Sequence, residues 1–348
     1  MNRKRRRCLE AVGAGVALTA LAGCLDELTE DDGETRTTEG GSDGGETGDD
    51  GGDDTDDTDD GGREVDREIK TAAGRFNRAG ASLRESQGNL EDPEGTDYDP
   101  DEPTAFLEEG REALEAAEEA GPDDDQATDI DELADYADVL EALIDGTAVV
   151  TDDALEDDVD AINDAIVAED LATARTEAEA LATRFEDAQL AVEAALESLD
   201  ALDEDRLADL AISDLDDVEE GGELLASVVD SLVILSTAMV SMVTGHEHLE
   251  EGGELAEEER FEDAIEAFEE AEAVYVETAG DLEGGRAAAP QGLVEYFDVA
   301  LCQTAALEDA ATAFREGAEA AADDDPLTAE EREADGEAAL EDAEACAE

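Results

Sequence analysis

The side chains best suited to metal chemistry are the two histidines, His246 and His248, in the run Thr-Gly-His-Glu-His-Leu-Glu-Glu. On a helix, residues two apart point about 200° from each other, so the two histidines do not bind one metal ion together. His246 with Glu250, or His248 with Glu251, has the spacing of a helical ligand pair for Zn or Fe, completed by carboxylates of other helices. The alternative is that both histidines are solvated, near a helix end.

The sequence offers little catalytic machinery besides these residues. Its 106 Asp and Glu residues make close carboxylate pairs unavoidable, so no acid–base pair stands out. There is no glycine-rich phosphate loop, and no Ser/His/Asp or Cys/His spacing that is typical of a nucleophilic enzyme. We therefore expect no enzymatic activity, and no cofactor other than the Zn or Fe ion just described.

Two cysteines near the C-terminus, Cys302 and Cys346, form the second candidate site. An Asp-Pro break followed by a capping-box sequence predicts an antiparallel hairpin of helices 291–323 and 329–346. Cys302 precedes Asp324 by 22 residues and Cys346 follows it by 22, so the hairpin brings them side by side. Outside the cell such a pair oxidises, which predicts a disulfide bond. The alternative is two unrelated buried thiols.

The charge balance is the most unusual feature of the composition. The formal net charge is −86, and only Lys4 and Lys70 among the 20 cationic residues are lysines. Such self-repulsion opposes a compact state, but at about 1 M salt the Debye length falls to roughly 3 Å and screens it. We expect a protein that works in brine, with an ordinary acidic protein as the alternative. Binding to nucleic acid is not expected, because phosphate contacts need clustered Lys and Arg residues, and we expect no such grouping of cations in the mature chain.

The N-terminus has the parts of an export signal. A basic segment at residues 3–7 and an apolar segment at residues 11–22 precede Leu-Ala-Gly-Cys, which ends at Cys24. The run from Arg5 and Arg6 to Leu9 resembles a twin-arginine signal, and Leu-Ala-Gly-Cys resembles a lipobox. Together with the acidity, the chain resembles a haloarchaeal secreted lipoprotein. The resemblance implies cleavage before Cys24 and a thioether-linked lipid that anchors this cysteine to the outer face of the membrane. The alternative is an uncleaved anchor helix.

The segment after the lipobox contains nothing that could join a core. Residues 29–62 are Asp, Glu, Gly and Thr apart from one Ser and one Arg. Such a composition predicts a disordered, self-repelling tether, roughly 30 Å from end to end. We therefore divide the chain into a signal peptide (1–23), a lipidated cysteine with its tether (24–62) and an all-helical domain (63–348).

Helical periodicity dominates the remaining sequence. Apolar residues recur in steps of three and four from residue 171 and again from residue 293, and strand-like alternation is absent. The clearest stripe consists of Leu171, Ala174, Ala178, Leu181, Phe185, Ala188, Val192 and Ala195. Breaks are predicted at 92–103, 121–122, 199–205, 284–290 and 323–326. The fold class is all-α, with long antiparallel αα-hairpins in a bundle or an irregular array.

The most apolar stretch runs from Leu224 to Val243. Its length suits a bilayer, yet it contains Asp230 and several Ser and Thr residues, and acidic residues flank it. We therefore expect a central helix that is buried on most sides, with a membrane span as the alternative.

Four segments share a related sequence pattern, in which large and small residues alternate on one face of a helix. They begin at Leu107, Phe185, Phe261 and Leu307. The third copy resembles a tetratricopeptide repeat, through Gly252 and Leu255 on a first helix and Phe261, Ala264, Phe268 and Ala271 on a second. The copies begin 78, 76 and 46 residues apart, whereas the family repeats every 34. The resemblance therefore implies packed hairpins rather than a regular superhelix.

These features favour a lipid-anchored extracytoplasmic protein that binds other envelope proteins, since helical hairpins offer extended faces. Its partners would be membrane lipid, through Cys24, and proteins of the envelope. The alternative is a lipoprotein that binds a metal ion or a solute in its interior near His246 and His248.

Overall fold

The computed structural model describes residues 59–87, 98–152, 154–213 and 215–346. These residues form α-helices, one 3₁₀ turn and no strand, which confirms the predicted all-α class. The helices are α2 (Asp59–Gln87), α3 (Asp101–Glu119), α4 (Asp124–Val150), α5 (Ala154–Val167), α6 (Leu171–Ala201), α7 (Glu204–Asp209), α8 (Leu215–Glu257), α9 (Phe261–Ala288), α10 (Val294–Ala322) and α11 (Pro326–Ala345); the turn is η2 (Gln291–Leu293). Helix α2 begins at Asp59, four residues before the predicted boundary of the helical domain.

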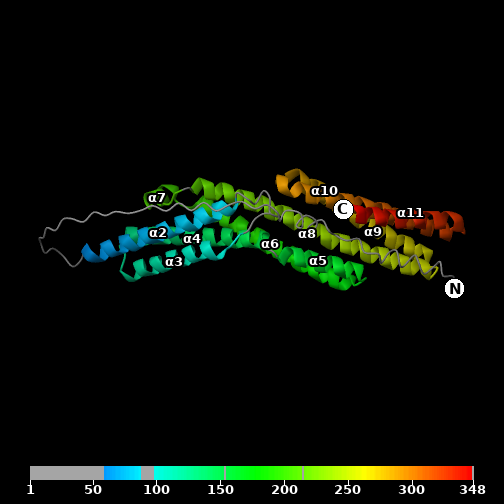
Figure 1. Cartoon of the computed structure of the whole chain (residues 1–348), viewed down its shortest axis with the longest axis horizontal. Helices are drawn as coiled ribbons and strands as arrows, with labels where there is room; N and C mark the ends of the chain where they lie inside the picture. The colour runs from blue at the N-terminus through cyan, green and yellow to red at the C-terminus, as the bar shows by residue number, and fades with distance from the viewer. Residues whose placement is uncertain (1–58, 88–97, 153, 214, 347–348) are drawn as a thin grey trace, which may run out of the picture.

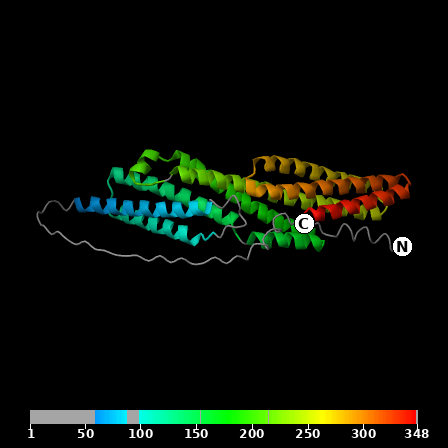
Figure 2. The same ribbon diagram turned by 45° about the horizontal axis from the view of Figure 1, so that its top comes forward.

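The described helices form an elongated body (Figure 1). At one end α2, α3, α4 and α7 pack together, and at the other end lie α5, α9, α10 and α11 (Figures 1 and 2). Helices α6 and α8 run through both ends and pack against each other. With 43 residues, α8 is about 65 Å long, so it forms the axis of the molecule.

The apolar stretch 224–243 lies in the middle of α8. Within the described ranges, α8 is the one helix that is long and apolar enough to cross a membrane, by length and composition alone. Half of its most apolar 18-residue segment is buried inside the protein. Helices α2, α4, α6, α9 and α10 pack against it. This arrangement agrees with the predicted central helix, although α8 extends well beyond the predicted stretch on both sides.

The predicted stripes are the buried faces of the helices. On α6 every residue of the stripe is buried except Leu171, which is partly buried. Phe185 lies at its centre and is 1% exposed. The hydrophobic periodicity therefore identifies the correct face of this helix.

Glycines let the helices approach one another closely. At five positions a Cβ atom would lie only 2.2–2.6 Å from an aromatic ring atom of a facing helix. The pairs are Gly110 with Phe76, Gly245 with Tyr275, Gly252 with Phe268, Gly285 with Phe297, and Gly336 with Phe314. Large side chains thus fill the space left by small ones on the facing helix. The recurring sequence pattern predicts this alternation of large and small residues, and in these pairs the small residue is glycine.

Three hairpins turn through connections of three residues, between α5 and α6, α8 and α9, and α10 and α11. Each has one residue in the left-handed region: Glu169 (φ 59°), Glu259 (φ 61°) and Asp324 (φ 61°). The first turn has the paired hydrogen bonds of a Schellman motif, from Glu169 N–H to Ile166 O and from Asp170 N–H to Ala165 O. The breaks after α4, α5 and α7 were not predicted, because no glycine or proline marks them.

The hairpin that resembles a tetratricopeptide repeat is present as the end of α8 and the start of α9, with Gly252 against Phe268. However, α9 alone has 28 residues, and a 34-residue repeat must accommodate two helices. These helices are therefore too long for that family's repeat.

Candidate functional site

His246 lies in the interface between α8 and α9, where it is 5% exposed. Its Nδ1–H donates to the carbonyl oxygen of Met242 at 2.9 Å, and the Tyr275 hydroxyl lies 3.3 Å from the same nitrogen. The rings of His246 and Tyr275 meet edge to face, with centroids 6.3 Å apart. Burial lowers the pKa of His246, so the interior favours the neutral ring.

His248 contacts a different residue of α9. Its Nδ1 lies 3.2 Å from a carboxylate oxygen of Glu270, without the alignment of a hydrogen bond. Farther along α8, Glu251 is exposed, and burial with neighbouring carboxylates raises the pKa of Glu250. Across the described ranges no group of three or more His, Cys, Asp or Glu side chains is arranged to hold a metal ion.

Neither predicted pair, His246 with Glu250 or His248 with Glu251, is therefore completed to a Zn or Fe ligand set by a carboxylate of another helix among the described residues. The prediction of solvated histidines near a helix end is also wrong for His246. This residue is buried, and α8 continues for three further turns to Glu257.

Tyr275 and Glu270 were not identified from the sequence, although a signal for them exists. In an antiparallel hairpin, residues at similar distances from the turn lie side by side. With the turn at Glu259, His248 and Glu270 are equally distant from it, and the distances of His246 and Tyr275 differ by less than one helical turn. The same reasoning about Asp324 predicts the cysteine pair.

Two other buried hydroxyls of this region are satisfied within their own helices. The hydroxyls of Thr278 and Thr304 donate to the carbonyl oxygens of Val274 and Ala300, at 2.8 and 2.7 Å. The Thr304 hydroxyl also lies 3.5 Å from the sulfur of Met242. Because both hydroxyls already donate their hydrogen to a backbone carbonyl oxygen, neither has a hydrogen left to donate to a ligand.

Arginines link the helices across the surface. Among the described residues, nine arginines form an ion pair with an acidic residue of another helix. The pairs are Arg75–Glu109, Arg84–Asp217, Arg111–Asp138, Arg175–Glu247, Arg184–Asp158, Arg206–Asp129, Arg286–Asp298, Arg315–Glu272 and Arg332–Glu316. Each is partly exposed and contributes roughly 0–1 kcal/mol. Among the described cations outside α2, all but Arg260 therefore link one helix to another.

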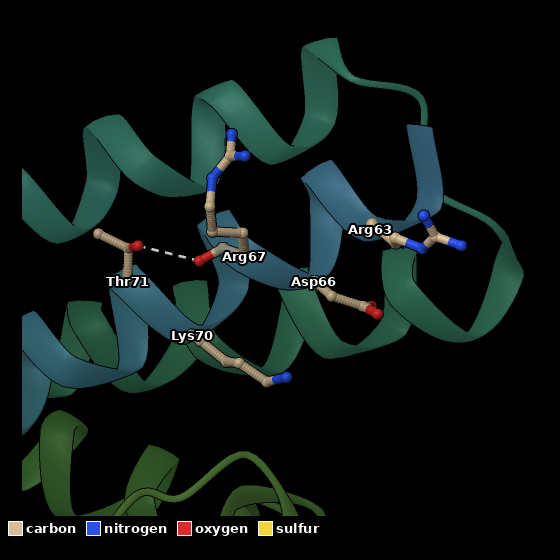
Figure 3. Close-up of a pocket in the computed structure, with 5 residues that line it drawn as sticks. All are labelled: Arg63, Asp66, Arg67, Lys70 and Thr71. Atoms are coloured by element: carbon tan, nitrogen blue, oxygen red, sulfur yellow. Dashed lines mark hydrogen bonds between the residues drawn. The ribbon is translucent and has the colours of Figure 1, made fainter. Parts of the chain in front are cut away.

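Helix α2 departs from the acidic character of the chain. It carries six cations, Arg63, Arg67, Lys70, Arg75, Arg78 and Arg84, balanced by six acidic residues. The expectation that the mature chain has no grouping of cations is therefore corrected. Three of them border a shallow depression (Figure 3), but Arg63, Arg67 and Lys70 point in different directions there, and Arg67 pairs with Glu64 and Glu68. The depression therefore lacks the convergent charges that an anion site requires.

The second predicted site is confirmed. Cys302 on α10 and Cys346, directly after α11, form a disulfide bond, with Cα atoms 5.9 Å apart. The hairpin turns at residues 323–325, as predicted. The bond joins the last helix to its neighbour near the free end of the chain.

The export and lipidation residues Arg5, Arg6 and Cys24 lie outside the described residues, as does most of the predicted tether. Comparison of the chain with protein-family models, curated proteins and solved structures finds no match in any of the three. The fold therefore defines the class alone: an all-α protein of long packed hairpins with a disulfide-linked C-terminal helix.

Proposed function

We propose that this chain is a lipid-anchored, extracytoplasmic protein of a halophile that binds other proteins of the cell envelope. Arg5, Arg6 and the motif that ends at Cys24 support export and lipid attachment. The acidic and glycine-rich segment that follows suits a tether that holds the helical body away from the lipid. The net charge of −86 supports a salt-rich surrounding.

The binding role is supported by the elongated array of helices. Helices α6 and α8 extend along this body and connect its two ends (Figure 2). Extended helical arrays offer long faces to protein partners. The side chains with the most reactive chemistry, His246 and the two cysteines, make contacts within the body instead. These features support a binding module over an enzyme.

Capture from membranes tests the binding role. The tagged chain is cross-linked on cells in high salt, extracted with detergent and purified, and its partners are identified by mass spectrometry. We expect one or a few envelope proteins in stoichiometric amounts. The matched control is Cys24→Ser, which removes the anchor and leaves the helical body unchanged. Recovery of the anchored chain alone would contradict the binding role.

The lipid anchor is tested separately by Cys24→Ser, with Cys8→Ser as the matched control. If Cys24 carries the lipid, Cys24→Ser releases the chain to the medium or leaves it unprocessed, because the nucleophile for the thioether is lost. Cys8→Ser lies within the signal and should leave the mature protein in the membrane fraction. Fractionation with mass measurement of the mature N-terminus distinguishes the two. Equal membrane retention and equal processing of both variants would exclude the anchor.

A second candidate function, binding of a metal ion or a solute in the interior, is favoured by one observation. His246 Nε2 is buried and has no hydrogen-bond partner among the described residues. Metal analysis of protein purified from high-salt medium tests this candidate. Stoichiometric Zn or Fe that is lost in His246→Gln but retained in His248→Gln would support it, and metal-free protein would contradict it.

A further inference from the structure

The last helix, α11, depends on a single neighbour. Within the described residues it packs extensively against α10, and its contacts with other elements are marginal. Of its 20 residues, Gly336, Leu340 and Ala343 are buried. All substantial contacts of α11 therefore lie on one surface of one other helix.

That surface of α10 is shaped for α11. The ring of Phe314 lies against Gly336, where a Cβ atom would approach it to 2.6 Å. Arg332 on α11 pairs with Glu316 on α10 at 3.2 Å. The other side of Phe314 stacks on Phe268 of α9, with centroids 5.8 Å apart, so the ring is held in place. A helix that binds here needs a glycine opposite Phe314, and α11 supplies it.

The covalent link is accessible from solvent. Cys302 is exposed and Cys346 is partly exposed. Both border a shallow depression of about 700 Å³ together with Gln291, Val294 and Asp298. A small thiolate can therefore reach the sulfur atoms without unfolding the protein, which is the condition for thiol–disulfide exchange.

The connection between α10 and α11 is short and contains a left-handed residue. It has three residues, 323–325, and Asp324 has a φ of 61°. Aspartate tolerates this conformation better than most residues with a side chain, but it still prefers a negative φ. Opening this hinge relieves that conformation, and short hinges under strain favour exchange of an element between copies.

We propose that α11 is an exchangeable element and that the surface of α10 it covers binds the α11 of a second copy of this chain. A catalytic thiolate attacks one Cys302–Cys346 bond, forms a mixed disulfide and releases the other cysteine as a thiolate. When the mixed disulfide is on Cys302, the released Cys346 thiolate attacks the Cys302 sulfur of the second copy's disulfide and expels the Cys346 thiolate of that copy. This second thiolate attacks the mixed disulfide at Cys302 of the first copy and expels the small thiolate, which is regenerated. Two bonds within chains become two bonds between chains, with no net oxidation. The exchange restores every α10–α11 contact in the dimer.

Complementary cysteine variants test the exchange directly. In a full-length background of Cys8→Ser and Cys24→Ser, one chain carries Cys302→Ser and another carries Cys346→Ser. Neither can close its own bond, but exchanged helices would place Cys346 of the first beside Cys302 of the second. We expect a heterodimer joined by this bond after mild oxidation in high salt, seen on a non-reducing gel and by peptide mapping. The disulfide-intact chain with a trace of thiol should likewise form dimers without free thiols.

A matched pair of insertions separates exchange from random collision. Gly-Ser-Gly inserted after Asp324 in both chains lengthens the hinge, whereas the same insertion after Gly121 lies in the connection between α3 and α4 and leaves the hinge unchanged. The α10–α11 contacts are the same in the closed and the exchanged forms, so only the hinge distinguishes them, and a longer hinge favours the closed form. We expect the insertion after Asp324 to lower the heterodimer yield about tenfold relative to the insertion after Gly121. A yield that is the same for both insertions, or a mixture that gives only homodimers or monomers, would overturn the proposal.

Discussion

Two adjacent glycines on α9 provide a stringent test of the packing at the scale of single residues. A Cβ atom at Gly285 would lie 2.6 Å from the ring of Phe297, whereas one at Gly284 would meet nothing within 4 Å. Gly285→Ala should therefore destabilise the protein by about 1–3 kcal/mol. Gly284→Ala should stabilise it by about 0.5–1 kcal/mol, because alanine favours helix. Urea unfolding in high salt measures both, and effects of the same sign would contradict the described interface.

The burial of His246 predicts a pH dependence of stability. Its pKa is lowered in the folded state, so between that value and the usual pKa of about 6.5 the unfolded chain binds a proton that the folded chain does not. Stability from the neutral ring is therefore complete above about pH 6.5 and is lost as the pH falls below it, by at most about 1.4 kcal/mol per unit.

His246→Leu should flatten this part of the stability profile, and His248→Gln should leave it unchanged. Both variants retain the carboxylates, so their common contribution cancels in the comparison. Urea unfolding at a series of pH values in high salt provides the measurement. A slope that survives in His246→Leu would assign the dependence to other groups.

At the scale of elements, the three-residue turns are the places where local preference and structure disagree. Glu169 and Glu259 adopt left-handed conformations that cost about 1–2 kcal/mol for residues with a side chain. Glu169→Gly or Glu259→Gly should therefore stabilise the protein by about 0.5–1 kcal/mol, after glycine's greater freedom in the unfolded chain is subtracted. Glu258→Gly, one position earlier, is the control and should not stabilise it. Thermal unfolding decides between these outcomes.

The same turns explain which elements could be predicted. The predicted breaks at Gly121-Pro122 and Asp325-Pro326 fall at connections, with Pro326 opening α11, whereas the predicted break at 284–290 comes too early because α9 continues to Ala288. The turn at Glu169 has neither residue, and its hydrogen bonds form only when α5 and α6 pack together. Local sequence therefore identifies helices and their buried faces, whereas turns that depend on packing escape it.

The candidate sites follow the same division. The pairing of Cys302 with Cys346 could be predicted because a recognisable turn fixes the register of the two helices. The contacts of His246 were not predicted, because the repeat-like pattern places a turn between Leu255 and Phe261 but no glycine or proline marks the residue at which the chain turns, Glu259. The nine arginines that link helices depend on contacts between elements, which periodicity within one helix does not contain.

At the scale of the whole molecule, the continuous helices α6 and α8 couple the two ends. Each end completes its core with part of α8, so neither end retains all its contacts when the other unfolds. The largest described hydrophobic cluster accordingly extends from Val65 on α2 to Ala343 on α11. We therefore interpret the described helices as one cooperative unit.

Repulsion between negative charges destabilises the folded helices, so we expect their stability to depend on the salt concentration. The chain carries a formal charge of −86, and partly exposed arginine pairs offset little of it. Dilution from concentrated salt to about 0.1 M lengthens the Debye length to about 10 Å, so carboxylates on neighbouring helices repel each other. We expect cooperative loss of helical circular dichroism during this dilution. Adjusting the dilute sample towards the isoelectric point of about 4.1 should restore helicity, because protonation removes the repelling charge. Unchanged helicity at low salt and neutral pH would show that the core tolerates its charge without screening.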